Sequence, residues 1–348
     1  MRRCSVSPKK PVPHLNSMKT KAPIFIFFLA FSLVSENPEH DAPKKIAYEL
    51  VENQMTARVS WESGGFEAVF RRSEESPVRI MSYNIWNGFE WGKDTVRKAK
   101  CVAWIKSQQP DVLALQELCG YTEEQLRKDA LEWGHTHVQL LKTEGYPTAL
   151  TSNNPIQLKD RIVEPFWHGL LHCESYGIDF YVVHLSPADC NIRLEEARWI
   201  TEKIRQESGE AYIILGDFNA YSPVDGTWLE EKVDLRNRSL QRSNEEHSNL
   251  RMGEFDYSVI SEFLALPAVD VCLGKMDLQK AFTFPTPALI GKFNHTARTV
   301  VQYRVRIDYI LASPALALGC TYAKVFNEGD TDLLSDHFPV MAEFKIMH

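Results

Sequence analysis

Several features that mark familiar protein classes are missing from this chain of 348 residues. Its seven cysteines are widely spaced and form no CxxC pair, which argues against a zinc-finger type of metal site. No apolar run reaches the ~20 residues that cross a bilayer, and no repeat or low-complexity tract is present. A Gly-x-Ser-x-Gly elbow and a phosphate-binding P-loop are also missing, which disfavours the enzymes that depend on them.

An excess of positive charge is missing as well. The formal net charge is -7, and no dense run of basic residues occurs. Nucleic acid and anionic lipid repel an acidic chain unless a local basic patch or a bound cation compensates. The composition, with 44% hydrophobic and 24% charged residues, is that of a globular protein with a sizeable core.

The N-terminus has the pattern of an export signal. Basic residues precede an apolar run from Ile24 to Val34, which has the length of a signal-peptide core. We therefore expect residues 1–35 to be a cleaved leader and the mature protein to be secreted or periplasmic. A compact version of the pattern begins at Met18, so the start codon is either Met1 or Met18. The alternatives are an uncleaved anchor and a buried helix.

The cysteines leave two alternatives open. Removal of the leader would take Cys4 and leave six cysteines in the mature chain. An even number in an exported protein permits disulfides, whereas buried free thiols are equally consistent with the wide spacing.

Residues 36–76 are predicted to be a linker and an N-terminal β-hairpin extension. The polar, Pro-containing stretch 37–45 is typical of a linker. Two segments of strand character, 56–61 and 66–70, flank Glu62-Ser63-Gly64-Gly65, which is typical of a hairpin turn.

Residues 77–348 alternate strand and helix patterns, which predicts one layered α/β domain. The expected strands are Val78–Ile85, Val112–Leu115, Phe180–His184, Tyr212–Leu215, Arg304–Leu311 and Val340–Ile346, and the expected helices are Asp94–Ser107, Thr122–Gly134 and Leu194–Gln206.

Polar residues recur at the ends of these strands. They are Asn84, Glu117, His184, Asp217 with Asn219, Asp308, and Asp336 with His337. Because strand ends of one sheet lie near each other, these side chains are expected to converge. Carboxylate and amide oxygens without thiolates suit a hard cation such as Mg²⁺ or Mn²⁺. Each residue alone also fits a turn, a solvated strand end or a core histidine, so the recurrence carries the prediction.

These motifs resemble the endonuclease/exonuclease/phosphatase superfamily, which includes deoxyribonucleases, apurinic endonucleases, secreted sphingomyelinases and inositol-polyphosphate phosphatases. The resemblance runs from about Arg79 to the C-terminus and rests on Gly-Asp-Phe-Asn at 216–219, Ser-Asp-His at 335–337, and Glu117. It implies an α/β (α+β) fold, a four-layer αββα sandwich of two packed mixed β-sheets flanked by helices. It also implies that 77–348 is the catalytic domain of a phosphoric ester hydrolase dependent on Mg²⁺ or Mn²⁺.

The resemblance further implies roles for the metal and water sites. Glu117 would be the main metal ligand, with Asn84 beside it on metal or phosphate, and Asp336 would complete the metal site. Asp217 would orient or deprotonate the attacking water, and Asn219 would hold that water or the phosphate oxygens.

The remaining implied roles concern the phosphate. His337 would bind it and stabilise developing charge or move a proton, and Asp308 would fix the tautomer of His337. His184 would contact the phosphate, as in the deoxyribonuclease and sphingomyelinase branches. Tyr146 matches a phosphate-facing tyrosine of the apurinic endonucleases. One departure is at 153–154, where Asn-Asn stands in place of a basic residue that family members often have.

The substrate class stays open at this level. The favoured prediction is an exported phosphodiesterase or endonuclease that activates water for in-line attack. A sphingomyelinase-like or small phosphate-ester hydrolase is one alternative, and a non-catalytic binding module on the same fold is another. The expected partners are therefore nucleic acid, a phospholipid headgroup or a small phosphate ester, and no dedicated protein partner is evident for what we expect to be a monomer.

The segment 221–303 separates two of the motifs and is a candidate for substrate specificity. Its arginines are interleaved with glutamates, which favours a solvated loop of mixed charge over a phosphate-gripping surface. The arginines include Arg236, Arg238, Arg242 and Arg251.

Overall fold

The structure is a computed structural model that describes residues 45–51, 54–61, 64–71 and 77–346. The expected leader and most of the expected linker lie outside the described residues. The chain divides into two units, 1–74 and 75–348, which are treated separately below.

The first unit contains a three-stranded antiparallel sheet. Its strands are β1 (Lys45–Val51), β2 (Gln54–Trp61) and β3 (Gly64–Arg71), paired in that order. The pair β2–β3 occupies the segment for which the sequence predicts a hairpin. Strand β1 was not predicted, although Ile46, Tyr48 and Leu50 alternate with other residues in the period-2 pattern of a strand.

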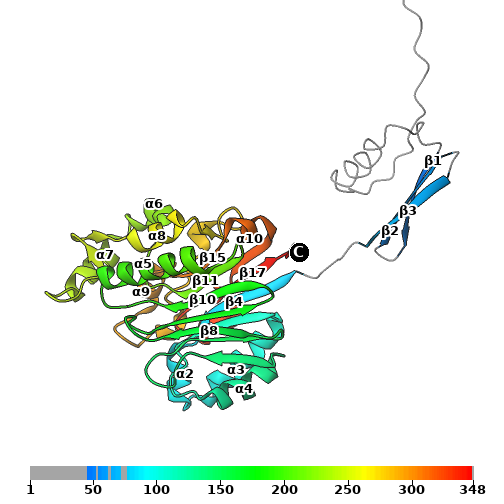
Figure 1. Cartoon of the computed structure of the whole chain (residues 1–348). Helices are drawn as coiled ribbons and strands as arrows, with labels where there is room; N and C mark the ends of the chain where they lie inside the picture. Colours follow the sequence, from blue (N-terminus) through cyan, green and yellow to red (C-terminus); the bar gives the residue numbers. More distant parts are fainter. Residues whose placement is uncertain (1–44, 52–53, 62–63, 72–76, 347–348) are drawn as a thin grey trace, which may run out of the picture. The chain divides into compact units, whose positions relative to one another are not determined.

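Two six-stranded mixed sheets form the centre of the second unit (Figure 1). In order across the first sheet, the strands are β16 (Cys320–Val325), β17 (Val340–Phe344), β4 (Val78–Asn84), β5 (Val112–Gln116), β7 (Ala149–Ser152) and β6 (His137–Leu140). The second sheet runs β14 (Val269–Asp270), β15 (Asp308–Ala312), β11 (Tyr212–Asp217), β10 (Ile178–His184), β9 (Leu170–Ser175) and β8 (Gln157–Ile162). The pairs β4–β5 and β10–β11 are parallel, and the other pairs are antiparallel.

The sheets pack face to face, and helices cover their outer faces. Ile80 and Ala114 of the first sheet share one buried cluster with Phe180 and Leu215 of the second. On the outer face of the first sheet lie α3 (Thr95–Gln108) and α4 (Glu123–Glu132), and on that of the second lie α5 (Cys190–Glu207) and α8 (Ser258–Ala265). The four-layer αββα sandwich is thereby confirmed.

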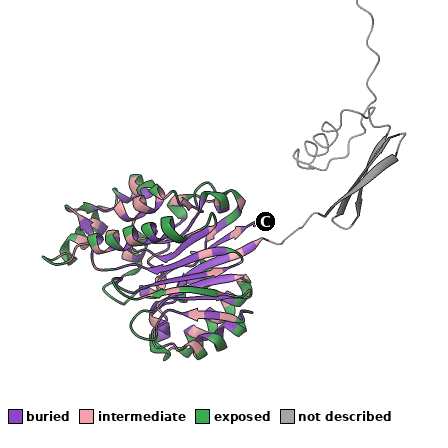
Figure 2. Cartoon of the chain, viewed as in Figure 1, coloured by how far each residue is buried: buried purple, intermediate pink, exposed green. Residues whose placement is uncertain are grey.

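This layering explains why the central strands are apolar on both sides. All residues of β5 and β11 are buried, as expected when each sheet is covered on both faces (Figure 2). The helices instead alternate buried and exposed residues. Their beginnings are set by side-chain caps: Asp94 accepts from the Arg97 N–H at 2.9 Å, and Thr122 accepts from the Gln125 N–H at 3.2 Å.

Shorter elements complete the second unit. They are α2 (Trp86–Trp91), α6 (Gly226–Leu229), α7 (Val233–Arg242), α9 (Ala297–Gln302), α10 (Pro314–Gly319), the two-stranded pair β12 (Leu250–Arg251) and β13 (Glu254–Phe255), and four 3₁₀ turns at Pro223–Asp225, Leu278–Lys280, Pro287–Leu289 and Gly329–Leu333. The segment 221–303 is therefore not a loop, because it contains three of these helices and the buried helix α8.

The strand expected to begin at Arg304 begins four residues later, at Asp308. The guanidinium of Arg306 is buried between the carboxylates of Asp225, at 3.0 Å, and Asp270. In the same segment the backbone of Val305 pairs with Phe284, and the ladder between β11 and β15 reaches only as far as Asp308.

The six described cysteines are all buried and free. Of the two alternatives, the free thiols are therefore confirmed for Cys101, Cys119, Cys173, Cys190, Cys272 and Cys320. Within the described ranges, no helix is both long enough and apolar enough to cross a membrane.

Gly216 is the position in β11 where a side chain is least tolerable. Its φ is +143°, and an added Cβ would lie 1.9 Å from the carbonyl oxygen of Val183 on β10. We expect Gly216→Ala to lower the free energy of unfolding by roughly 3 kcal/mol, because the strands must separate or the backbone must distort. Urea denaturation measures this, with Gly209→Ala as the control, since an added Cβ at Gly209 meets no atom within 4 Å. Equal stability of the two variants would contradict this account.

Candidate active site

The strand register brings the predicted residues to one edge of the sandwich. Asp217, the last residue of β11, is paired with His184 on β10 and with Asp308 on β15. In the other sheet, Asn84 at the end of β4 is paired with Gln116, and Glu117 follows directly. The two edges meet, because the Asn84 amide donates to Glu117 Oε1 at 3.2 Å and to Asp217 Oδ2 at 3.1 Å.

His337 lies between two buried aspartates. Its Nδ1 is 2.9 Å from Asp308 Oδ2, and its Nε2 is 3.6 Å from Asp217 Oδ2. Burial opposes protonation of the ring, but the charges of Asp308 and then Asp217 outweigh it and hold the pKa of His337 well above its ordinary value. In the protonated ring, Nδ1–H donates to Asp308 and Nε2–H is directed toward Asp217.

His184 is a second, differently tuned histidine. Its Nε2 is 3.6 Å from Asp217 Oδ2, and its ring stacks on His168 with centroids 4.1 Å apart. Burial, with the neighbouring His168 and His337, holds the pKa of His184 well below its ordinary value. The pKa values of the two neighbouring histidines are therefore shifted in opposite directions.

Asn219 and Asn84 hold the carboxylates in place. The Asn219 N–H donates to Asp217 Oδ1 at 2.9 Å, and its side-chain amide donates to the Leu185 carbonyl at 3.0 Å. Asn84 is fully buried, and its carbonyl oxygen accepts from the Trp86 N–H at 3.0 Å. Asn84 thus acts in this structure as an amide donor that bridges Glu117 and Asp217.

The carboxylates are crowded enough to suit a cation. Burial, together with the negative charges of Asp308 and Glu117, raises the pKa of Asp217 to about 7 against the opposing effect of His337. Burial and the charge of Glu117 likewise raise the pKa of Asp336 to about 7. Such an all-oxygen donor set is what a hard divalent cation binds, and a bound cation would offset the repulsion. The residues present therefore fit a divalent metal ion.

Glu117 is positioned by a left-handed backbone turn that the sequence analysis missed. Residues 86–91 of α2 have φ between +42° and +59°, and the N–H of Asn87 donates to Glu117 Oε2 at 2.6 Å. Glu117 itself has φ +63°. Left-handed backbone is unfavourable for residues other than glycine and occurs mostly where function requires it.

Arg97, also missed, holds this turn. Its guanidinium donates to the carbonyls of Ile85 at 2.9 Å and Trp86 at 3.0 Å, and it lies over the rings of Trp86 and Phe89. Nothing in the sequence separates this buried arginine from the solvated basic residues of the same helix.

Tyr146 lies at the margin of the site. Its ring is 38% exposed and tilts against His168 at 5.4 Å between centroids. His168 is buried, and burial lowers its pKa to about 4. It was missed because it precedes β9, whereas the sequence pattern marks residues that follow strands.

Two other groups lie apart from this edge. Asn153 donates to Asp111 at 2.8 Å, near the beginning of β5. The position where family members often have a basic residue therefore lies at the end of β5 opposite to Glu117. Asp160, His172 and Glu207 are close enough to share a metal ion. The Lys203 ammonium already lies between Asp160, at 2.6 Å, and Glu207, which makes this group an ion-pair network.

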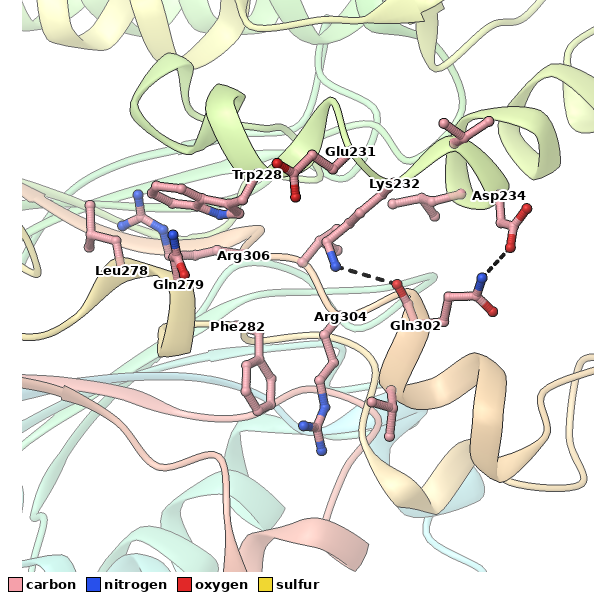
Figure 3. A pocket seen from close by; sticks show the side chains of 14 residues that line it. Trp228, Glu231, Lys232, Asp234, Leu278, Gln279, Phe282, Gln302, Arg304 and Arg306 are labelled. Atoms are coloured by element: carbon pink, nitrogen blue, oxygen red, sulfur yellow. Dashed lines mark hydrogen bonds between the residues drawn. The ribbon is translucent and has the colours of Figure 1, made fainter.

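Two hollows adjoin this region. The smaller, of about 290 Å³, is lined by Asn219 and His337 and so opens beside the catalytic edge. The larger, of about 630 Å³, is lined by none of the predicted site residues (Figure 3). In it Lys232 donates to the Gln302 carbonyl at 3.4 Å.

Comparison with known proteins identifies the family of the chain. The model of the Endonuclease/Exonuclease/phosphatase family matches residues 81–337, and the chain belongs to that family. No curated protein sequence matches the chain. Membership makes the protein a phosphoric ester hydrolase, and enzymes of this family depend on a divalent metal ion, for which the carboxylates at this edge, among them Asp217 and Asp308, form a candidate site.

Solved structures share the fold at low sequence identity. An AP endonuclease from Archaeoglobus fulgidus is 18% identical, with a TM-score of 0.56, over 77% of this chain and 100% of that one. The 3′-5′ exonuclease NExo from Neisseria meningitidis is 20% identical, with a TM-score of 0.54 and the same coverages of 77% and 100%. A 3′ phosphatase NExo from Neisseria bound to a product DNA hairpin is 19% identical, with a TM-score of 0.54, again covering 77% and 100%.

The pairing of His337 with Asp308 predicts a large effect of a small change. Asp308→Asn should lower kcat by about 10³- to 10⁴-fold, because the neutral amide no longer holds the Nδ1–H tautomer or stabilises the cationic ring. Steady-state hydrolysis of an activated phosphodiester measures the effect. The matched control is Asp179→Asn, which removes an aspartate 3.0 Å from His172 at the other end of β10 and should leave kcat unchanged. Similar kcat values for the two variants would show that Asp308 has no part in catalysis.

Proposed function

We propose that the protein is an exported, Mg²⁺-dependent phosphodiesterase, of the endonuclease or exonuclease type, that hydrolyses its substrate by in-line attack of water. The observation that supports it most is the convergence of Asp217, Asp308 and His337 with Glu117 at one edge of the sandwich. Water-activating, phosphate-binding and metal-binding groups are then within reach of a single phosphate.

Each side chain has a distinct task in this proposal. Glu117 and Asp336 would hold the cation, which when bound neutralises phosphate oxygens, and the Asn84 amide keeps Glu117 in place beside it. Asp217 accepts the proton of the attacking water and fixes its direction. Its raised pKa suits a group that gains a proton in the reaction.

The phosphate is held by donors on the other side. The cationic His337 donates from Nε2 to a phosphate oxygen and compensates the charge that builds up there. Asn219 and the neutral His184 supply further contacts to the oxygens or the water. Tyr146 lies at the margin of the site, where its exposed ring contacts the phosphate from the solvent side.

Nucleic acid is the preferred substrate class in this proposal. The similar solved structures include an AP endonuclease and a 3′-5′ exonuclease, and one of them is bound to DNA. A sphingomyelinase-like or small phosphate-ester activity is the alternative. A non-catalytic binding module is disfavoured, because such a protein has no need of both Asp217 and the Asp308–His337 pair.

Metal dependence tests the proposal directly. Hydrolysis of bis-p-nitrophenyl phosphate should stop in EDTA and return with Mg²⁺. Glu117→Gln should raise the Mg²⁺ concentration needed for half-maximal rate by ~10-fold or more, because an amide is a weaker ligand than a carboxylate. Glu144→Gln, at an exposed position of the chain, is the control. Turnover that persists in EDTA would refute metal dependence, and no turnover with any metal would favour the binding module.

Export is a separate part of the proposal and has its own test. If residues 1–35 direct export, the full chain produced in a secreting host should appear outside the cytoplasm with a new N-terminus after the apolar run. N-terminal sequencing of the extracytoplasmic fraction measures this. Recovery of only uncleaved chain inside the cell would contradict export.

A further inference from the structure

The smaller hollow is lined by basic side chains although the protein as a whole is acidic, and we name it the basic pocket. Its lining contains three arginines and three histidines but no aspartate or glutamate, and those six residues are Arg193, Arg238, Arg242, His247, His295 and His337. Because the chain has a formal net charge of -7, an acid-free pocket is a local reversal of the overall charge.

Four arginines of the segment 221–303 fall into two groups. Arg236 is paired with Glu254, and Arg251 is paired with Asp256 at 2.6 Å. Among the described residues, Arg238 and Arg242 have no carboxylate within the 4.0 Å of an ion pair. Of these four arginines, the two without a carboxylate partner line the basic pocket.

The two arginines also lie near each other. Arg238 donates to His295 Nε2 at 3.2 Å and to the Phe293 carbonyl at 3.3 Å, and its guanidinium lies over the ring of Tyr303. Burial and the charge of Arg238 lower the pKa of Arg242, and burial with the charges of Arg238 and Arg242 lowers that of His295. Like charges held together are unfavourable unless an anion completes the arrangement.

The size and place of the pocket limit that anion. About 290 Å³ is at the small end of ligand pockets, with room for one sugar-sized unit. Asn219 and His337 form part of its wall, so an occupant lies next to the phosphate being hydrolysed. Arginine is well suited to hold a phosphate through two N–H donors.

We propose that the basic pocket binds a second phosphate group of the substrate, on the unit adjacent to the scissile phosphate, with Arg238 and Arg242 as its ligands. This proposal rests on the proposed function and narrows it. A choline headgroup is cationic and would be repelled by the pocket, so sphingomyelin is disfavoured relative to nucleotide-like esters.

A matched pair of substrates tests the proposal. The p-nitrophenyl ester of thymidine 5′-phosphate is compared with the same ester carrying an additional 3′-phosphate. The wild-type protein should show a kcat/KM at least about tenfold higher for the doubly phosphorylated ester, the effect of one charge-assisted hydrogen bond. Arg242→Gln should bring the ratio of the two kcat/KM values close to one.

The control is Arg236→Gln, which alters the same helix but an arginine already paired with Glu254. It should leave the ratio unchanged. A third ester, with a methyl group on the 3′-phosphate, distinguishes an internal phosphodiester of a polynucleotide, for which the preference persists, from a terminal phosphate, for which it is lost. Both of these results support a second-phosphate site.

A wild-type ratio near one would overturn the basic pocket as a phosphate site, and so would a ratio that Arg242→Gln leaves unchanged. In both cases, continued hydrolysis of bis-p-nitrophenyl phosphate would leave the proposed phosphodiesterase function standing. Failure of the wild-type protein to hydrolyse any of these esters would overturn both.

Discussion

The crowding of carboxylates at one edge of the sandwich is the constraint on which the rest of the site depends. Asp217 and Asp308 come from one sheet, Glu117 from the other, and Asp336 from the residues before β17. Buried like charges repel, and the cationic His337 offsets only part of that repulsion. A bound divalent cation would supply the remaining compensation, so the carboxylates that repel one another at this edge are also the groups that would hold the metal.

The fold holds these charges together through backbone features that allow little change. Strand β11 lies between β10 and β15, and the absence of a side chain at Gly216 lets it approach the carbonyl of Val183 closely. On the other sheet, Arg97 holds the left-handed turn that presents the N–H of Asn87 to Glu117. Strand β11 and the left-handed turn both end at the carboxylates. The packing that fixes these two elements therefore also fixes the positions of the catalytic groups.

Sequence patterns were sufficient for the layered fold and for the convergence of the strand-end residues, because both follow from strand periodicity and from polar residues that end apolar strands. They were insufficient where the outcome depends on contacts between distant segments. Arg238 and Arg242 have the same appearance in sequence as Arg236 and Arg251, and only the positions of Glu254 and Asp256 in space separate the two pairs. The backbone pairing of Val305 with Phe284, just before β15, likewise joins distant residues that no local pattern marks.

The central claim is that one divalent cation is bound where Glu117 approaches the other carboxylates. Crystals grown with Mn²⁺ test it most directly through anomalous diffraction. The account predicts an anomalous peak within bonding distance of the Glu117 carboxylate, on the side facing Asp336 and Asp217. The account would be contradicted by the absence of such a peak in a well-ordered crystal, or by Mn²⁺ bound instead among Asp160, His172 and Glu207.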